Sequence, residues 1–345
     1  MYAPDCQYHN GHYYLYYCLA NNTKTEGVAT SNSPNGPFTN GTNIKVGGFN
    51  EIDPAVFIDD DGQAYYIWGQ FNAKMAKLKP DMISIDTATI RENIVTEKEH
   101  FFHEGGYLVK RDGIYYFVYA HMGRAGRPTC IGYATSNSPM GPYTYGGVII
   151  DNDHSDPGCW NNHGSIAEFN GQWYVFYHRP THASYTMRKA CLEPIAFAED
   201  GSIAEVEMTS QGAAAPFAMG TQIDAAQACL LYGNTRIRAI ARDNEALCEI
   251  QNDDAAAYKY INFDRNADSL KIHIMPGQAS FDIDVKLGSA WGKTIARINV
   301  PANTAGKEAI TYSCKIEQTD GVHAVWLKFW GNPGKEAYID WLQFF

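Results

Sequence analysis

Four segments of the chain share one pattern, in which a polar residue and a glycine precede a run of aromatic and β-branched residues. They are HNGHYYLYYC (9–18), DDGQAYYIWG (60–69), RDGIYYFVYA (111–120) and FNGQWYVFYH (169–178). Asp-Gly or Asn-Gly before such a run predicts a tight hairpin turn, because both turn positions need positive φ. The glycines, separated by 51, 51 and 58 residues, are Gly11, Gly62, Gly113 and Gly171. The pattern therefore predicts four related hairpins along the first half of the chain.

A second repeat supports the same period. GVATSNSPNGPFT (27–39) matches GYATSNSPMGPYT (132–144), and the Pro and Gly residues of SPxGP predict a tight turn after a strand. A period near 50 residues, with several strands in each period and no helical periodicity, is typical of propeller blades. We therefore predict four recognisable blades in residues 1–210. The alternative is an ordinary β-sandwich whose turns resemble one another by coincidence.

The pattern changes near residue 222. The Gly/Ala-rich stretch QGAAAPFAMG (211–220) predicts a linker over residues 211–221. Seven alternating strands then follow: YKYINFD (258–264), LKIHIMP (270–276), SFDIDVKLG (280–288), KTIARINVP (293–301), ITYSCKIEQ (310–318), HAVWLKFWG (323–331) and YIDWLQFF (338–345). Short strands at near-regular spacing predict an all-β second domain, a β-sandwich of the jelly-roll type, over residues 222–345.

Composition narrows the range of partners. The 345 residues carry a net charge of −11, with 23 Tyr and 7 Trp. This acidity argues against nucleic acid as a partner, since a polyphosphate attracts basic surfaces. An acidic, aromatic-rich surface suits a sugar, whose hydroxyls bind carboxylates and whose C–H faces pack on rings, although an acidic protein without a sugar ligand fits the same composition. No apolar run approaches eighteen residues, so we expect no membrane partner.

The eight cysteines are scattered and form no C-x-x-C pair, which predicts buried free thiols rather than a disulfide framework or a zinc site.

Candidate catalytic residues stand just before the repeated hairpins. They are Asp5 in YAPD, Asp53 in EIDPAVF, Glu104 in FFHEGGYL and His163 in NNHGSI. In a propeller these positions point into one shared funnel, and a pair of carboxylates is what glycoside hydrolysis requires. Taken singly, each has a structural interpretation: Asp53 a turn residue before Pro54, Glu104 a structural carboxylate, and His163 a buried histidine. Their recurrence at one place in the repeat favours the functional interpretation.

These segments resemble a known family. YAPDCQYHNGHYYLYY, IDPAVFIDDDGQAYYIWG, HEGGYLVKRDGIYYFVYA, IGYATSNSPMGPYTYGG and NNHGSIAEFNGQWYVFYHRP look, in this order, like glycoside hydrolase family 43. The resemblance implies a five-bladed β-propeller and an inverting enzyme, in many members an α-L-arabinofuranosidase, a β-xylosidase or an arabinanase. The end of the chain, GVHAVWLKFWGNPGKEAYIDWLQF, is similar to a family 6 carbohydrate-binding module.

The resemblance also implies roles for single residues. Glu104 corresponds to the general acid, and Asp53 to the carboxylate that orients the acid and adjusts its pKa. His163 corresponds to a residue on the propeller axis, where members often hold a calcium ion or a water cluster; no other cofactor is expected. Arg188 in YTMRKACLEPI resembles an arginine that approaches the sugar, where its guanidinium gives paired hydrogen bonds.

The chain departs from the family pattern at its start. The general-base aspartate of the family belongs to the first blade, whereas Met1 stands where the second blade begins. We therefore expect an N-terminally incomplete propeller. Three explanations stay open: a start assigned to an internal Met, a substitute base with Asp5 as the nearest candidate, or a relic that only binds sugar. A missing blade breaks ring closure, which a four-bladed ring or pairing between two chains in a homo-oligomer would restore.

The function expected is hydrolysis of terminal bonds in plant hemicellulose by an exo-acting α-L-arabinofuranosidase, a β-xylosidase or both. An endo-acting arabinanase would need an open groove. The alternative is a carbohydrate-binding protein impaired by loss of the base. A polysaccharide target in the plant cell wall favours secretion or a periplasmic location, although the sequence shows no signal peptide. In the second domain we expect Trp291 to stack on a sugar and Asn332 to hydrogen-bond one, with Tyr258, Trp326 and Trp330 as further aromatic candidates.

Overall fold

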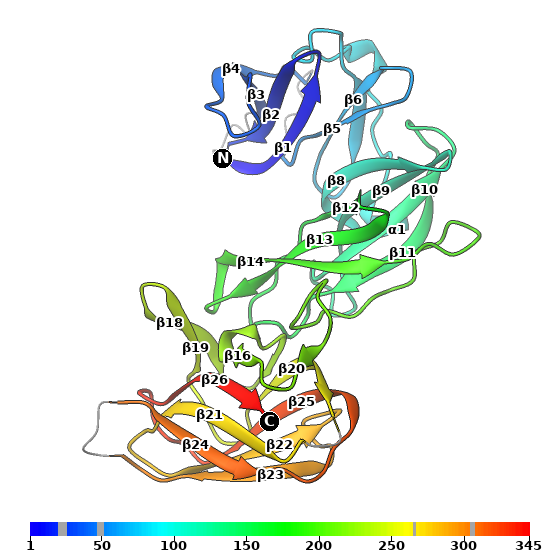
Figure 1. The fold of residues 1–345 in the computed structure, drawn as a ribbon. Coiled ribbons are helices and arrows are strands. Elements are labelled where there is room, and N and C mark those ends of the chain that lie inside the picture. The colour runs from blue at the N-terminus through cyan, green and yellow to red at the C-terminus, as the bar shows by residue number, and fades with distance from the viewer. Residues whose placement is uncertain (20–25, 47–51, 265–266, 304–307) are drawn as a thin grey trace. The chain divides into compact units, whose positions relative to one another are not determined.

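The computed structural model describes residues 1–19, 26–46, 52–264, 267–303 and 308–345, and strands make up most of its regular structure (Figure 1). The chain divides into two compact units. The first unit comprises residues 1–151, 162–178 and 194–206, and the second comprises 152–161, 179–193 and 207–345. Residues 211–221, predicted as a linker, belong to the second unit, where β15 (Phe217–Ala218) pairs in parallel with β20 (Ala255–Phe263). The predicted domain boundaries stay predictions.

The first part of the chain folds into successive sheets whose strands lie side by side in chain order. The first sheet contains β1 (Tyr2–His9), β2 (His12–Cys18), β3 (Glu26–Ser31) and β4 (Thr39–Asn43). The second contains β5 (Ala55–Ile58), β6 (Ala64–Trp68) and β7 (Lys74–Lys77). Two short helices follow, η1 (Thr87–Thr89) and α1 (Glu97–His100). The third sheet contains β8 (Phe102–Arg111), β9 (Ile114–His121), β10 (Cys130–Ser136) and β11 (Thr144–Asp151), and the fourth contains β12 (Ser165–Phe169), β13 (Gln172–Thr181) and β14 (Ser184–Ile195). These meanders are the arrangement expected of propeller blades.

Three of the four predicted hairpin turns have the expected two-residue form. Asn10–Gly11, Asp112–Gly113 and Asn170–Gly171 all have positive φ at both positions. The fourth is a longer loop, in which the Asp59 amide donates to the Gln63 carbonyl at 3.0 Å. The physical reason is that the Asp59 carboxylate accepts hydrogen bonds from Lys110 Nζ at 2.8 Å and from the Tyr115 hydroxyl at 2.6 Å, which hold the loop against the neighbouring sheet.

The aromatic runs of the first unit form its core. β9 is buried at almost every position, so both of its faces are covered. The tyrosines that are buried there keep their hydroxyls paired: Tyr16 donates to the Met82 carbonyl and Tyr116 to the Gly201 carbonyl, each at 2.8 Å. Pairing removes most of the cost of burying a phenol while the ring contributes its full apolar area. This explains why the runs are continuously aromatic rather than alternating.

The second unit is a β-sandwich, as predicted. One sheet has the order β15, β20, β25 (Gly321–Trp330), β22 (Phe281–Leu287) and β23 (Thr294–Val300), with β17 (Leu230–Tyr232) also paired to β20. The other has the order β18 (Arg236–Ala241), β19 (Asn244–Cys248), β26 (Tyr338–Phe344), β21 (Ser269–Met275) and β24 (Ile310–Lys315), with β16 (Gln222–Asp224) paired to β26 and η2 (Ala225–Gln227) following it. All seven predicted strands are present, and their apolar positions meet in one core.

The faces of the strands in the sandwich explain which aromatic candidates are structural. Tyr258 is fully buried and donates to the Ala225 carbonyl at 3.0 Å, so it belongs to the core. Trp326 is nearly buried as well, with its Nε1 donating to the Gly288 carbonyl.

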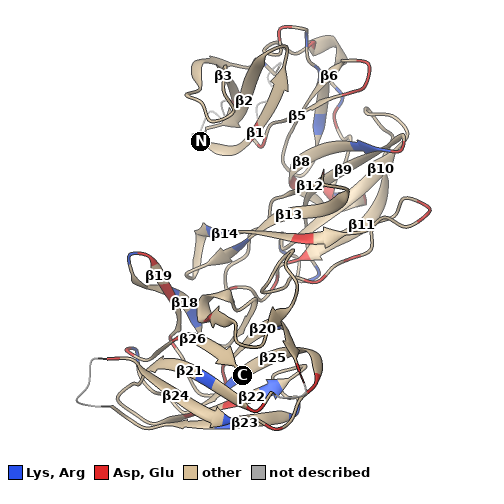
Figure 2. Ribbon diagram, viewed as in Figure 1, with Lys and Arg blue, Asp and Glu red and all other residues tan. Residues whose placement is uncertain are grey.

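Basic residues lie on β22 and β23 (Figure 2), where Arg297 binds Asp284 through two nitrogens at 2.6 and 2.9 Å. All eight cysteines are free thiols, as predicted, although Cys6 is exposed. Among the described residues, no helix has the length and apolar character needed to cross a membrane.

One buried carboxylate provides a test of the sandwich. Asp254 accepts hydrogen bonds from the Asn234 amide, the Thr235 hydroxyl and the Gln251 amide at 2.9, 2.9 and 3.0 Å. We expect Asp254→Ala to lower the free energy of unfolding by ~3 kcal/mol or more, because three donors lose their acceptor. Urea unfolding of the full chain measures the effect, with the exposed Asp243→Ala as control. Equal midpoints for the two variants would contradict the expectation.

Candidate functional site

Three of the four sequence-predicted positions line one cavity of about 180 Å³ in the first unit. Asp5 comes from β1, Asp53 lies two residues before β5, and His163 lies two residues before β12. The third sheet contributes Gly106 and Tyr107 of β8 to the same wall. Segments of four successive sheets therefore meet at this cavity, although the fourth predicted residue, Glu104, is not among those that line it.

Glu104 stands two residues before Gly106 on β8, where the pairing with β9 shifts register on both sides of it. Its carboxylate Oε2 accepts a hydrogen bond from Gln70 Nε2 at 2.8 Å and lies 3.9 Å from His103 Nε2. The side chain is 24% exposed. A carboxyl group that is held on one side by an amide and open to solvent on the other can exchange a proton with a bound ligand.

The glycine after Glu104 allows a close approach to His163. A Cβ on Gly105 would lie 2.7 Å from His163 Nε2, and Gly105 has φ +65°, a conformation that side chains disfavour. Only glycine fits both requirements at this position. The Gly-Gly pair of HEGG is therefore explained by packing, and it places the imidazole beside the strand that carries the candidate acid.

Asp53 is 7% exposed and has φ +59°. Aspartate tolerates this left-handed backbone better than most residues, but the structure assigns no turn at Asp53, so the positive φ does not by itself support the turn interpretation. Its position on the cavity wall is compatible with the functional interpretation, since strained backbone gathers at ligand sites. Its role toward Glu104 stays a prediction.

Asp5 connects the first two sheets. Its Oδ2 accepts from the Val56 amide of β5 at 2.8 Å and from Gln7 Nε2 at 3.2 Å. Burial raises the pKa of Asp5 above its usual value, and these hydrogen bonds oppose the rise only in part. A carboxylate with a raised pKa is the stronger base, but one of its oxygens is already bound.

A calcium ion at His163 does not fit the described residues well. Calcium takes six to eight oxygen ligands, whereas His163 offers an imidazole nitrogen. Within the described ranges, no group of three or more His, Cys, Asp or Glu side chains is arranged to hold a metal. An ion or a water cluster at this place stays a prediction.

Arg188 lies on β14, in the part of that strand that belongs to the second unit, and its side chain is exposed. Its contact with a sugar stays a prediction.

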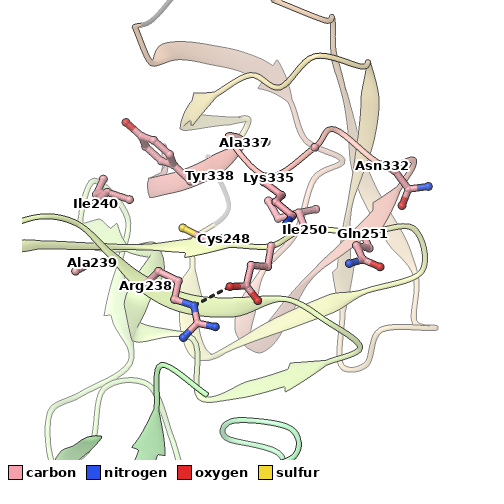
Figure 3. A pocket seen from close by; sticks show the side chains of 12 residues that line it. Arg238, Ala239, Ile240, Cys248, Ile250, Gln251, Asn332, Lys335, Ala337 and Tyr338 are labelled. Carbon is pink, nitrogen blue, oxygen red and sulfur yellow. Dashed lines mark hydrogen bonds and ion pairs between the residues drawn. The ribbon is translucent and has the colours of Figure 1, made fainter. Parts of the chain in front are cut away.

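The two predicted sugar-binding residues of the second unit lie at different places. Trp291 is 74% exposed between β22 and β23, where Lys328 Nζ lies 5.6 Å from its ring centre. Asn332 lines a cavity of about 900 Å³ (Figure 3), in which Arg238 Nε lies 2.8 Å from Glu249 Oε1. Asn332 Oδ1 already accepts from the Asn252 amide at 3.0 Å. Trp291 is not among the residues that line this cavity, so the two residues do not form one subsite, and each role stays a prediction.

Sequence reasoning missed Gln70, the residue that binds Glu104. Gln70 follows the repeated aromatic run of β6, but its role depends on the end of β6 meeting the start of β8, which the sequence does not show. The Phe71 amide joins the two there by donating to the His103 carbonyl at 2.7 Å.

The chain is similar to known protein families and to characterised relatives. The model of glycosyl hydrolases family 43 matches residues 1–203, and that of carbohydrate binding module family 6 matches residues 227–345. A xylosidase/arabinosidase of Thermoclostridium stercorarium is 29% identical over 96% of this chain and 80% of its own length. An arabinoxylan arabinofuranohydrolase of Bacillus subtilis is 30% identical over 96% of this chain and 72% of its own. A similar enzyme of Paenibacillus polymyxa is 28% identical, and this chain spans 58% of it.

Solved structures agree with these relatives. The crystal structure of a Bacillus subtilis arabinoxylan arabinofuranohydrolase in complex with cellotetraose has a TM-score of 0.51 and 29% identity, covering 99% of this chain and 79% of that one. A family 43 enzyme of Xanthomonas citri complexed with xylose has a TM-score of 0.53 and 30% identity, covering 60% of this chain and 72% of its own.

The raised pKa of Asp5 gives a prediction about stability. The folded chain binds the Asp5 proton more tightly than the unfolded chain, so ionisation of Asp5 costs stability once the pH rises above the usual value of 3.8. Asp5→Asn keeps an acceptor for the Val56 amide and removes the charge. We expect a higher urea midpoint for the variant at pH 7 and no difference below pH 3.8, with Asp243→Asn as control. A lower midpoint at pH 7 would show that the carboxylate charge itself stabilises the contact with β5.

Proposed function

Because the chain belongs to glycosyl hydrolases family 43 and ends in a carbohydrate-binding module of family 6, we propose that it hydrolyses terminal bonds of hemicellulose as an exo-acting α-L-arabinofuranosidase, a β-xylosidase or both. The names of the relatives support this choice of sugars. The observation that carries the proposal is the meeting of Asp5, Asp53 and His163 at one cavity, with Glu104 on the adjoining strand.

Glu104 suits the role of general acid in an inverting reaction. Its carboxyl group would give its proton to the oxygen of the departing sugar while water attacks the opposite face. The Gln70 amide, which donates to Glu104 Oε2 at 2.8 Å, stabilises the carboxylate that is left behind. Asp53, nearly buried on the cavity wall, would orient the acid through the electrostatic field of its carboxylate.

Water activation requires a second carboxylate at about 6.5–9.5 Å from the acid. Asp5 is the candidate within this chain, and its raised pKa suits a base. Its bonds to Val56 and Gln7 favour a second candidate function, in which the chain binds sugar without turnover because Asp5 is fixed in a structural role. Pairing between two chains stays a prediction, which a solution mass measurement tests.

Glu104→Gln tests the proposal. The glutamine keeps the shape of the side chain but has no proton to give, so kcat/KM on a natural oligosaccharide should fall about 10²–10⁴-fold. The loss should be smaller on a 4-nitrophenyl glycoside, whose leaving group departs without protonation. The exposed Glu92→Gln serves as the matched control and should leave kcat/KM unchanged.

The outcomes separate the two candidate functions. Equal losses on both substrates would contradict the role of Glu104 as acid. A parent chain that binds oligosaccharide but hydrolyses neither substrate would support the binding protein instead.

A further inference from the structure

Two exposed phenylalanines lie in the first unit near the start of β8, the strand that carries the candidate acid Glu104. Phe71 is 49% exposed and Phe101 is 47% exposed. Both have left-handed backbones, with φ +64° and φ +59°. Bulky residues rarely adopt this conformation, and Phe101 occupies the position after α1 that glycine usually takes. The chain therefore keeps two rings at positions where the backbone alone favours glycine.

Hydrogen bonds fix both backbones to the same residue. The Glu97 amide donates to the Phe71 carbonyl at 2.8 Å, and the Phe101 amide donates to the Glu97 carbonyl at 2.9 Å. The Phe71 amide donates to the His103 carbonyl at 2.7 Å. Phe71 and Phe101 are consequently held on either side of Glu97, at the start of the strand that carries Glu104. Such bonding is what lets strained residues persist.

Each ring packs on one side and is open on the other. The Phe71 ring lies edge-on to His103 at 5.3 Å, and His103 Nε2 lies 3.9 Å from Glu104 Oε2. The Phe101 ring lies 5.2 Å from His121 and 5.4 Å from Tyr145. The imidazoles and the phenol orient the two rings, and about half of each ring's surface is left to meet a ligand.

We propose that Phe71 and Phe101 bind the sugar on the leaving-group side of the bond that is cut, as an aromatic rim beside Glu104. The inference rests on the proposed function. An acid that protonates the departing oxygen lies next to the leaving group, so rings beside the acid contact that group rather than the terminal sugar. The ligand chemistry is that of a backbone of linked pyranose rings, such as xylan, whose C–H faces pack against aromatic faces. Phe71 and Phe101 thereby determine the preference for a polymer over a small glycoside.

The test compares two substrates that share the terminal sugar. The first is arabinoxylan or a xylo-oligosaccharide, whichever the unmodified chain hydrolyses. The second is the methyl glycoside of the same terminal sugar. Phe71→Ala and Phe101→Ala should lower kcat/KM on the polymer about tenfold, mainly through KM, and change it less than twofold on the methyl glycoside. Phe71→Tyr keeps a ring and should retain the activity on the polymer.

Two further variants exclude a purely structural explanation. Phe71→Gly relieves the backbone, so its urea midpoint should equal or exceed that of the parent while activity on the polymer falls. Phe169→Ala removes a ring that is even more exposed, at the end of β12, and should leave kcat/KM unchanged on both substrates.

The possible results are distinguishable. An equal decrease of kcat/KM on both substrates, or no decrease on either, would overturn the inference and leave the proposed function intact. A parent that cuts neither substrate would overturn the proposed function and the inference with it.

Discussion

The site depends on how closely the starts of four strands approach one another. Two contacts set this approach. The Val56 amide donates to Asp5 and joins the first sheet to the second, and Gly105 lets β8 lie against the imidazole of His163. A side chain on Gly105 would collide with the His163 imidazole unless that ring shifted. Because each contact joins segments far apart in the chain, polar groups from distant repeats share one cavity without any of them lying near another in sequence.

The rest of the first unit supports this approach by its rigidity. The aromatic strand β9 is buried on both faces, and the hydroxyl of its Tyr116 donates to the Gly201 carbonyl of another segment. A core of this kind resists displacement, since its buried rings are closely packed and hydroxyls such as those of Tyr16 and Tyr116 are hydrogen-bonded. Strained residues at the edge of the site, Asp53, Phe71 and Phe101, are tolerated because that frame holds them.

The features that could be predicted from the sequence are those that neighbouring residues determine, such as the hairpin turns. Asn-Gly and Asp-Gly fix a hairpin by themselves, so the turns at Gly11, Gly113 and Gly171 follow from the pattern. The loop at Gly62 does not, because a lysine and a tyrosine from another sheet bind Asp59.

Long-range geometry accounts for what was missed. Gln70 and Phe71 take their roles from the end of β6 meeting the start of β8, which no spacing within either segment reveals. In the sandwich, alternation predicted the seven strands from residue 255 onward but not the short strands before them. Alternation alone did not separate buried Tyr258 from exposed Trp291, but the position of Trp291 between two predicted strands did.

The proposed function requires that this cavity support inverting hydrolysis. The most direct measurement follows the anomeric signals of the released sugar by proton NMR during the first turnovers on a reactive aryl glycoside. We predict that the anomer opposite in configuration to the substrate forms first and then equilibrates. First release of the anomer that keeps the configuration of the substrate would contradict it, because that result requires a covalent intermediate rather than direct attack by water.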